Sequence, residues 1–222
     1  MKSCAAVRVL CLSLVIAAAT PAQANLLTNG SFELGAFVNQ GNDTMSLGAG
    51  STVITGWTVI TDTTAWIGPA NPFGLTASDG SFFLDLTDYG GGAPFAGMSQ
   101  TIATTSGATY SLSFDLGSST QWGVPDSITA SAAGTSQTFT SPTTGTDVWT
   151  PKILQFTASS ANTTVVLQGA SGINYIGLDN ASVECISNCS GGGGVAVPEP
   201  GTLALLGLGL VGLGVSRRKK AA

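Results

Sequence analysis

The segment "TYSLSFDLGSS" at residues 109–119 carries the clearest strand pattern in the chain. Its large apolar residues alternate with serine and aspartate, and they lie at Tyr110, Leu112, Phe114 and Leu116. Successive side chains of a β-strand point to opposite faces of the sheet, so a period of two places these four side chains on one face. The segment therefore predicts a strand with one buried face.

Seven shorter runs of similar composition lie on both sides of this strand, each bounded by Gly, Pro, Asn or Asp. They occupy residues 51–60, 81–86, 97–103, 136–141, 152–158, 163–170 and 175–184. The residues that fill helix surfaces, such as Glu, Lys and Arg, are scarce in this region. Many short strands separated by turns predict an all-β fold, an antiparallel β-sandwich with almost no helix.

The last of these runs contains an irregularity in its alternation. Ile176 and Leu178 share one parity, whereas Ala181 and Val183 share the other. One extra residue at Asp179–Asn180 would keep all four side chains on the core side, which is what a β-bulge provides. The alternative is a strand end followed by ordinary turn residues.

The amino terminus has the features of a secretory signal peptide. Lys2 and Arg8 precede an apolar run at residues 9–19, and Ala22-Gln23-Ala24 supplies the small residues of a cleavage site. We therefore expect the mature chain to begin at Asn25.

The carboxyl terminus, "VPEPGTLALLGLGLVGLGVSRRKKAA", combines a Pro-Glu-Pro motif, an apolar run and a basic end. These features lie at Val197, Pro198, Glu199 and Pro200, at residues 201–216, and at Arg217, Arg218, Lys219 and Lys220. As a helix the apolar run would reach about 24 Å, against a hydrocarbon core of about 30 Å. The four cations would stay on the cytoplasmic side, which places the rest of the chain outside.

This ordered set resembles the PEP-CTERM sorting signal of Gram-negative bacteria, which an exosortase is thought to process near the Pro-Glu-Pro. The resemblance implies an exported protein, held first as a precursor at the inner membrane by a short transmembrane helix and then delivered to the cell surface or extracellular matrix. A plain carboxy-terminal anchor is the alternative. The chain thus divides into a signal peptide (1–24), a β-sandwich ectodomain (25–189), a glycine-rich linker (190–196) and the sorting signal (197–222).

Charge excludes several classes of partner and of catalytic site. Between residues 25 and 200 a single cation, Lys152, faces twelve acids, a net charge of −11. Such a field repels nucleic acid and anionic lipid, and it suits calcium, cationic partners or simple solubility. The chain has no histidine, which excludes catalytic triads and His-metal sites. The two cysteines of the ectodomain, Cys185 and Cys189, are expected to form a local disulfide in an oxidising compartment.

Five motifs of the ectodomain occur in an order that resembles the bacterial surface family called choice-of-anchor C. They are "NLLTNGSFELG", "ITGWTV", "DGSFFLDL", "GMSQTIATTSGATYSLSFDLG" and "GLDNASVE", within residues 25–184. That family is similar to the galactose-binding-like sandwiches, which include many carbohydrate-binding modules and a group of plant cell-wall proteins. The resemblance implies a jelly-roll-like sandwich at a cell surface, with no assured activity.

Sugar binding needs aromatic faces that stack on sugar C–H groups, beside amides and carboxylates that bond hydroxyls. Trp57 and Trp149 are expected in the core, and Trp66 is ambiguous. The candidates for a binding surface are Trp122 with Gln121 and Asp126, and Tyr89 with Asp88. The alternative is that these loop aromatics plug one end of the sandwich.

The resemblance also implies a structural calcium ion, because a metal often ties the first strand to the last in galactose-binding-like modules. The candidate ligands are Glu33, Asp179 and, from a following loop, Asp43. Both Glu33 and Asp179 could instead be ordinary solvated or backbone-capping groups.

The leading functional hypothesis is a noncatalytic module that binds extracellular polysaccharide. The second is a structural or adhesive matrix component without a sugar pocket. The third is a glycosidase that uses a carboxylate pair, Asp85 with Asp88 or Glu33 with Glu184.

Overall fold

The computed structural model describes residues 24–90, 92–122, 125–142 and 148–189. The predicted sorting signal, the glycine-rich linker and residues 1–23 of the predicted signal peptide lie outside these ranges. The described residues form strands and turns but no α-helix, as the sequence predicts. They accordingly contain no helix that is long and apolar enough to cross a membrane.

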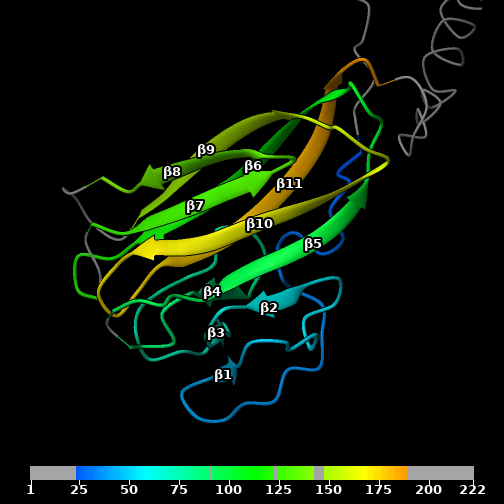
Figure 1. Ribbon diagram of the computed structural model, residues 1–222. Coiled ribbons are helices and arrows are strands. Elements are labelled where there is room, and N and C mark those ends of the chain that lie inside the picture. The colour runs from blue at the N-terminus through cyan, green and yellow to red at the C-terminus, as the bar shows by residue number, and fades with distance from the viewer. Residues whose placement is uncertain (1–23, 91, 123–124, 143–147, 190–222) are drawn as a thin grey trace, which may run out of the picture. The chain divides into compact units, whose positions relative to one another are not determined.

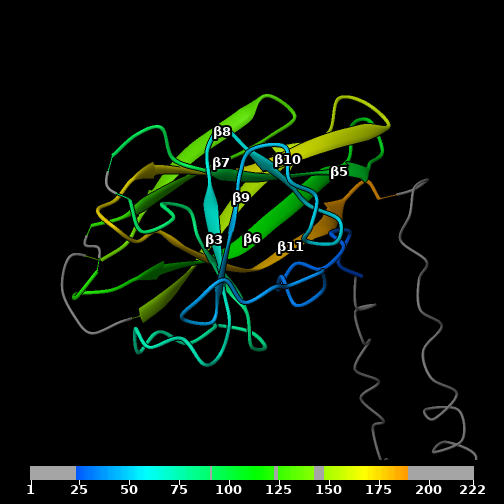
Figure 2. The same ribbon diagram turned by 90° about the horizontal axis from the view of Figure 1, so that it is seen from below.

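Two antiparallel sheets form a β-sandwich (Figures 1 and 2). The six-stranded sheet has the order β1 (Thr44–Leu47), β3 (Thr64–Ile67), β4 (Phe83–Asp85), β11 (Gly177–Ser187), β6 (Thr109–Ser118), β9 (Val148–Thr157). The five-stranded sheet has the order β2 (Thr58–Ile60), β5 (Gly97–Ala103), β10 (Asn162–Ser171), β7 (Ser127–Ala132), β8 (Thr135–Thr140). Neighbours such as β4 and β11 are far apart in sequence, so the topology is that of an all-β sandwich with crossing connections.

The predicted strands correspond closely to the observed ones where alternation is strong. Strand β6 covers the quoted segment, β5 coincides with residues 97–103, and the last four predicted runs overlap β8 to β11. The runs at 51–60 and 81–86 contain only the short strands β2 and β4. Strands β1, β3 and β7 are not predicted. Strand β3, "TAWI", is buried on both faces and so shows no alternation, and β7, "SITASA", has mostly small side chains.

The core between the sheets contains the residues that the period-two pattern selects. Tyr110, Leu112, Phe114 and Leu116 are all buried. Trp57 and Trp66 are buried beside them, and their indole N–H groups donate to main-chain carbonyls of the amino-terminal segment. Each indole therefore buries a large apolar surface without leaving its N–H unpaired.

The predicted β-bulge is present in β11. The register between β11 and β6 shifts between Asp179 and Ser182, and Asn180 adopts a φ of 50°. The extra residue keeps Ile176, Leu178, Ala181 and Val183 buried. The Asp179 side chain follows Leu178 in the alternation and therefore points to the opposite face, where it lies buried under a loop.

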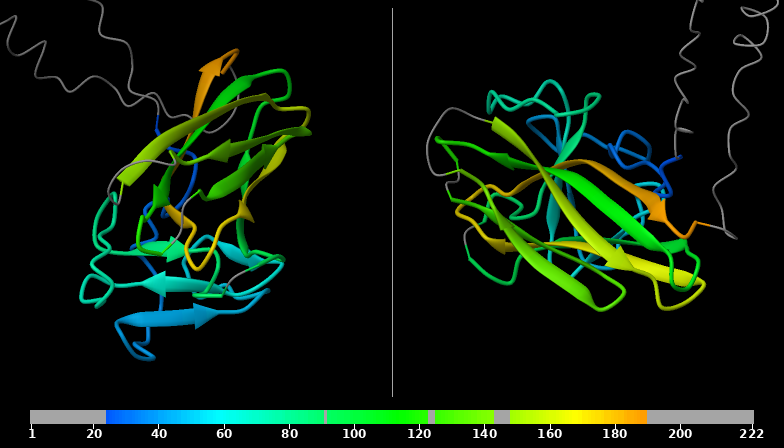
Figure 3. Two further views of the ribbon diagram at one scale, coloured as in Figure 1. Left: turned by 90° about the vertical axis from the view of Figure 1, so that its left-hand side faces the viewer. Right: turned by 90° about the horizontal axis from the view of Figure 1, so that it is seen from above.

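That loop, residues 69–82, lies on the outer side of the six-stranded sheet (teal in Figure 3). It covers a second, smaller apolar cluster formed by Ala65 and Ile67 of β3 and Phe83 of β4. Leu75 and Phe73 of the 69–82 loop pack against this cluster, together with Trp122, Trp149 and Tyr175. Because its outer face is covered, this part of the sheet is buried on both sides.

Side-chain bonds close the described domain at its two ends. The Asn25 amide donates to the Ala181 carbonyl, and its oxygen accepts from Val183 N–H, so the first described residues are tied to β11. Cys185 and Cys189, the predicted pair, form a disulfide with Cα atoms 5.9 Å apart.

Candidate functional site

Three carboxylates hold the 69–82 loop by its main chain. Asp43 accepts from Ala70 N–H at 2.7 Å. Asp179 Oδ2 accepts from the N–H groups of Ser78 and Asp79, and Glu33 Oε1 accepts from those of Ser81 and Phe82. Charge-assisted bonds of this kind fix a segment that has no strand partner of its own.

Two tryptophans hold the same loop by its carbonyls. Trp122 Nε1 donates to the Phe73 carbonyl at 3.2 Å, and Trp149 Nε1 donates to the Thr76 carbonyl at 2.9 Å. Side chains from the rest of the domain therefore bond both N–H groups and carbonyl groups of the loop main chain. The loop provides one wall of a pocket.

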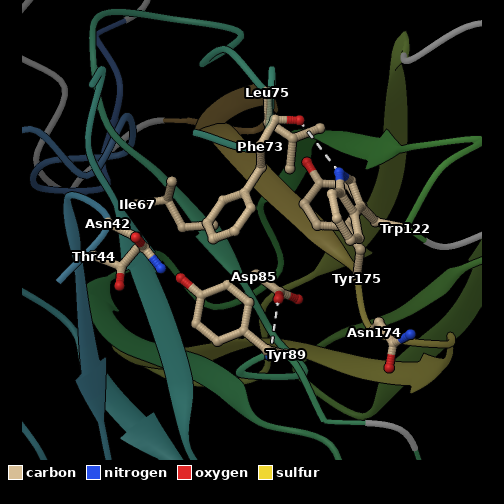
Figure 4. Close-up of a pocket in the computed structure, with 10 residues that line it drawn as sticks. All are labelled: Asn42, Thr44, Ile67, Phe73, Leu75, Asp85, Tyr89, Trp122, Asn174 and Tyr175. Atoms are coloured by element: carbon tan, nitrogen blue, oxygen red, sulfur yellow. Dashed lines mark hydrogen bonds between the residues drawn. The ribbon is translucent and has the colours of Figure 1, made fainter. Parts of the chain in front are cut away.

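The pocket has a volume of about 390 Å³, within the range of small-molecule sites. It opens where β1, β3 and β4 meet the 69–82 loop and the connections that follow β4, β6 and β10. Its lining, shown in Figure 4, consists of Asn42, Thr44, Ile67, Phe73, Leu75, Asp85, Tyr89, Trp122, Asn174 and Tyr175.

Four aromatic rings dominate this lining: those of Phe73, Tyr89, Trp122 and Tyr175 (Figure 4). The Phe73 ring centroid lies 5.4 Å from that of Tyr89 and 5.8 Å from that of Trp122. Tyr89 remains 40% exposed, and Trp122 is half-buried. Exposed ring faces in a hollow suit a ligand with flat apolar surfaces.

A tight turn aims Tyr89 into the pocket. Asp88 and Tyr89 have φ values of 48° and 62°, a left-handed conformation that non-glycine residues rarely adopt. The Tyr89 N–H is 3.3 Å from Asp85 Oδ2. Burial raises the pKa of the Tyr89 hydroxyl to about 12, so it stays protonated.

Asp85 supplies the carboxylate of the pocket, and it is only 1% exposed. Its Oδ1 accepts from Ile176 N–H at 3.0 Å and from the N–H and hydroxyl of Thr87, both at 2.9 Å. Burial raises its pKa to about 6, against the lowering effect of these donors. The Asp85 carboxyl group is therefore mostly ionised at neutral pH. It lies near the centre of the view in Figure 4.

Asp85 is the only carboxylate among the residues described as lining the pocket. Asp88 lies outside the lining and accepts from the Ser46 hydroxyl. Glycoside hydrolysis by a carboxylate pair needs two such groups facing the same bond. Among the described lining residues, Asp85 has no second acid as a partner for that mechanism.

A model of the family "Protein of unknown function (DUF642)" matches residues 25–174 of this chain. The chain belongs to the DUF642 family. A second model, the PEP-CTERM protein-sorting motif, matches residues 196–219, which confirms the resemblance of the carboxyl terminus. No curated protein matches the chain.

Several solved structures resemble this DUF642 protein in fold. A family 4 carbohydrate-binding module is 18% identical, with a TM-score of 0.42, over 72% of this chain and 99% of that one. A family 35 module from Clostridium thermocellum is 12% identical, with a TM-score of 0.40, over 74% and 98%. An Arthrobacter globiformis isomalto-dextranase complexed with panose is 15% identical, with a TM-score of 0.43, over 65% of this chain and 24% of the enzyme.

The DUF642 structure brings two of the sequence candidates together and excludes three from the pocket. Trp122 and Tyr89 line the same pocket, although 33 positions separate them. Gln121 is exposed and Asp88 binds Ser46, so neither contributes to the lining. Asp126 is fully buried against the Ser141 hydroxyl, because it immediately precedes β7 and faces inward.

Of the two tryptophans that the sequence places in the core, only Trp57 lies there. Trp57 is buried, as predicted, and the ambiguous Trp66 is buried as well. Trp149 is half-buried on the outer side of the sheet, where its ring meets Phe83 edge-on at 5.8 Å. The prediction that Trp149 lies in the main core is wrong, because the 69–82 loop builds the second cluster around it.

The predicted calcium ligands are not gathered in one place. Glu33 and Asp179 bind the end of the 69–82 loop, whereas Asp43 binds its start at Ala70. Among the described residues, no group of three or more Asp, Glu, Cys or His side chains could hold a metal ion. Calcium binding stays a prediction, which a comparison of melting temperatures in calcium and in chelator would test.

Phe73, Asp85, Asn174 and Tyr175 are pocket residues that the sequence does not identify as binding residues. Phe73 follows a Gly-Pro-Ala-Asn-Pro stretch that reads as plain loop. Asp85 stands out in the sequence only as one member of a possible catalytic pair. Asn174 has a positive φ of 62°. Asparagine tolerates this turn conformation, so the Asn beside Gly-Ile is a sequence signal that could have indicated a turn here.

Proposed function

We propose that this protein is a noncatalytic carbohydrate-binding protein of the cell surface or extracellular matrix, and that the pocket around Asp85 holds the sugar. The observation that carries the proposal is the combination of four aromatic rings and one buried carboxylate in a single hollow. Rings stack on the C–H faces of sugars, and the carboxylate and the rim amides bond their hydroxyls.

The arrangement of the rings supports a preformed site. Phe73 and Trp122 hold each other through ring packing and through the bond from Trp122 Nε1 to the Phe73 carbonyl. Tyr89 is held at its N–H by Asp85 and at its ring by packing against Phe73. Side chains that are fixed before binding lose little entropy when a ligand arrives, which favours affinity.

The rim supplies polar groups of the kind that give specificity. Asn42 and Asn174 are exposed at the edge of the pocket (Figure 4), and each amide offers two donors and one acceptor. Their left-handed backbone conformations, with φ values of 55° and 62°, present the side chains at turns. Two amides and one carboxylate can bond several hydroxyls of one sugar unit.

The sorting motif supports the cellular placement. A PEP-CTERM motif at residues 196–219 agrees with export, a precursor held at the inner membrane, and processing by an exosortase-type enzyme. Delivery to the surface of a Gram-negative cell would bring the pocket to extracellular polysaccharide, the polymer that this compartment offers.

A glycan array with the exported protein, purified from the cells that produce it, tests the proposal. We expect binding to a limited set of oligosaccharides that share one sugar unit, and no release of reducing ends on prolonged incubation. No binding to any glycan would contradict it and would favour a structural matrix component. Hydrolysis of a bound glycan would contradict the noncatalytic role.

A further inference from the structure

The pocket contains negative charge that the described part of the protein does not balance. Ten acids and one lysine, Lys152, lie within the described residues. The Lys152 ammonium donates to the Thr140 carbonyl at 3.0 Å, and it does not line the pocket. The four donors of Asp85 are neutral N–H and O–H groups of Thr87, Tyr89 and Ile176. Within the described residues, the charge of this buried carboxylate is thus solvated by dipoles alone.

One oxygen of Asp85 keeps capacity for a further donor. Oδ1 accepts three bonds of 2.9 to 3.0 Å. Oδ2 receives only longer contacts, from Tyr89 N–H at 3.3 Å and from the Thr87 hydroxyl at 3.1 Å, and that hydroxyl is shared with Oδ1. Because its two contacts are long and one of them is shared, Oδ2 is the oxygen at which a donor of a ligand can form a strong, charge-assisted bond.

Two of the rings around Asp85 offer a ligand no free polar atom. The Trp122 N–H donates to the Phe73 carbonyl, and the Phe73 ring carries no polar atom. What these side chains offer a ligand is therefore their π faces. Aromatic faces attract cations, most strongly when several rings surround the cation and water is excluded.

We infer that the pocket selects a sugar with a free amino group, a hexosamine unit of a deacetylated polysaccharide, whose ammonium group bonds Asp85 Oδ2 among the aromatic rings. This inference rests on the proposed carbohydrate-binding function. The same charge disfavours uronic acids and sulfated sugars, because the described lining has no cation to receive their anionic groups.

Calorimetric titration of the exported protein with four oligosaccharides of equal length tests the inference. The oligosaccharides are those of glucosamine, N-acetylglucosamine, glucose and galacturonic acid, and choline serves as a cation without a sugar. At pH 7 we expect glucosamine oligomers to bind about tenfold more tightly than their acetylated counterparts, and galacturonate oligomers not to bind. Added salt should reduce the preference for the amine.

The Asp85→Asn variant removes the charge at nearly constant shape. It should lose the preference for glucosamine and bind the glucosamine and glucose oligomers within about twofold of each other. Asp88→Asn is the matched control, since Asp88 is the neighbouring acid outside the lining. It should keep the preference. If Asp85→Asn does not fold, the ligand series and its salt dependence on the unchanged protein decide.

The outcomes separate the inference from the function beneath it. Equal binding of neutral and amino sugars, or tighter binding of galacturonate, would overturn the inference and leave the proposed function standing. Binding of choline as tight as that of the glucosamine oligomers would overturn the assignment to a sugar. No binding of any oligosaccharide here or on the array would overturn both.

Discussion

Glu33 and Asp179 hold the two ends of one short stretch of main chain. Asp179 Oδ2 accepts from the N–H groups of Ser78 and Asp79 at 2.7 and 2.9 Å. Glu33 Oε1 accepts from those of Ser81 and Phe82 at 2.8 and 2.7 Å. Two residues 146 positions apart thus fix the end of the 69–82 loop, whose earlier part forms a wall of the pocket.

Gly80, which lies between these two anchors, should not tolerate a side chain. Its φ is +74°, and a Cβ atom there would lie 2.5 Å from Glu33 Cδ. We expect Gly80→Ala to lower the free energy of unfolding by about 1–2 kcal/mol for the backbone conformation and by about 1–3 kcal/mol for the displaced Glu33. Urea unfolding followed by fluorescence measures this.

Gly74 in the same loop provides the matched control. Its φ is +72°, and a Cβ atom at this position would have no neighbouring atom within 4 Å. Gly74→Ala should therefore show only the backbone cost. Equal losses in the two variants would contradict the anchoring role of Glu33.

The stability of the domain should increase on mild acidification. Burial raises the pKa of Asp179 to about 7 and those of Asp85 and Asp126 to about 6, above the ordinary value of 3.8. The folded state therefore binds more protons than the unfolded state between about pH 4 and about pH 7, so stability falls as pH rises through that window. We expect a higher melting temperature at about pH 5 than at about pH 8.

Asp179→Asn tests the origin of that pH dependence. Asp179 is buried, the like charge of Asp79 adds to the effect of burial on its pKa, and its carboxylate accepts from Ser78, Asp79 and Asn180 N–H. The variant should reduce the difference in melting temperature between about pH 5 and about pH 8. A higher melting temperature of the unchanged protein at about pH 8 than at about pH 5 would show that the buried acids do not control stability.

The carboxyl-terminal motif should be removed during sorting. Mass spectrometry of the surface-localised protein is expected to show a chain that ends before Gly201, because the Pro-Glu-Pro site precedes it. Recovery of an intact terminus with Arg217 to Lys220 would indicate a lasting anchor instead.

The sequence predicts the parts of this fold that depend on local pattern. Strand β6 and the bulge at Asp179–Asn180 follow from alternation and from a change of parity, because both are properties of neighbouring residues. Strand β3 escapes prediction because the 69–82 loop buries its outer face, and a strand buried on both faces has no polar side.

The pocket shows the limit of the same reasoning. Trp122 and Tyr89 can be identified from the sequence because aromatic residues among loop formers are unusual. Asp85, Phe73 and Asn174 cannot, because their association depends on bonds such as those from Ile176 to Asp85 and from Trp122 to Phe73. These bonds join residues 91 and 49 positions apart and leave no recognisable spacing in the sequence.

The most direct test of the account measures binding of the strongest oligosaccharide from the array to Trp122→Ala and Trp149→Ala. Both tryptophans donate to carbonyls of the 69–82 loop, but only Trp122 lines the pocket. We predict that Trp122→Ala lowers the affinity at least about tenfold while the protein stays folded, and that Trp149→Ala changes it much less. Unchanged affinity in a folded Trp122→Ala protein would contradict the assignment of the sugar to this pocket.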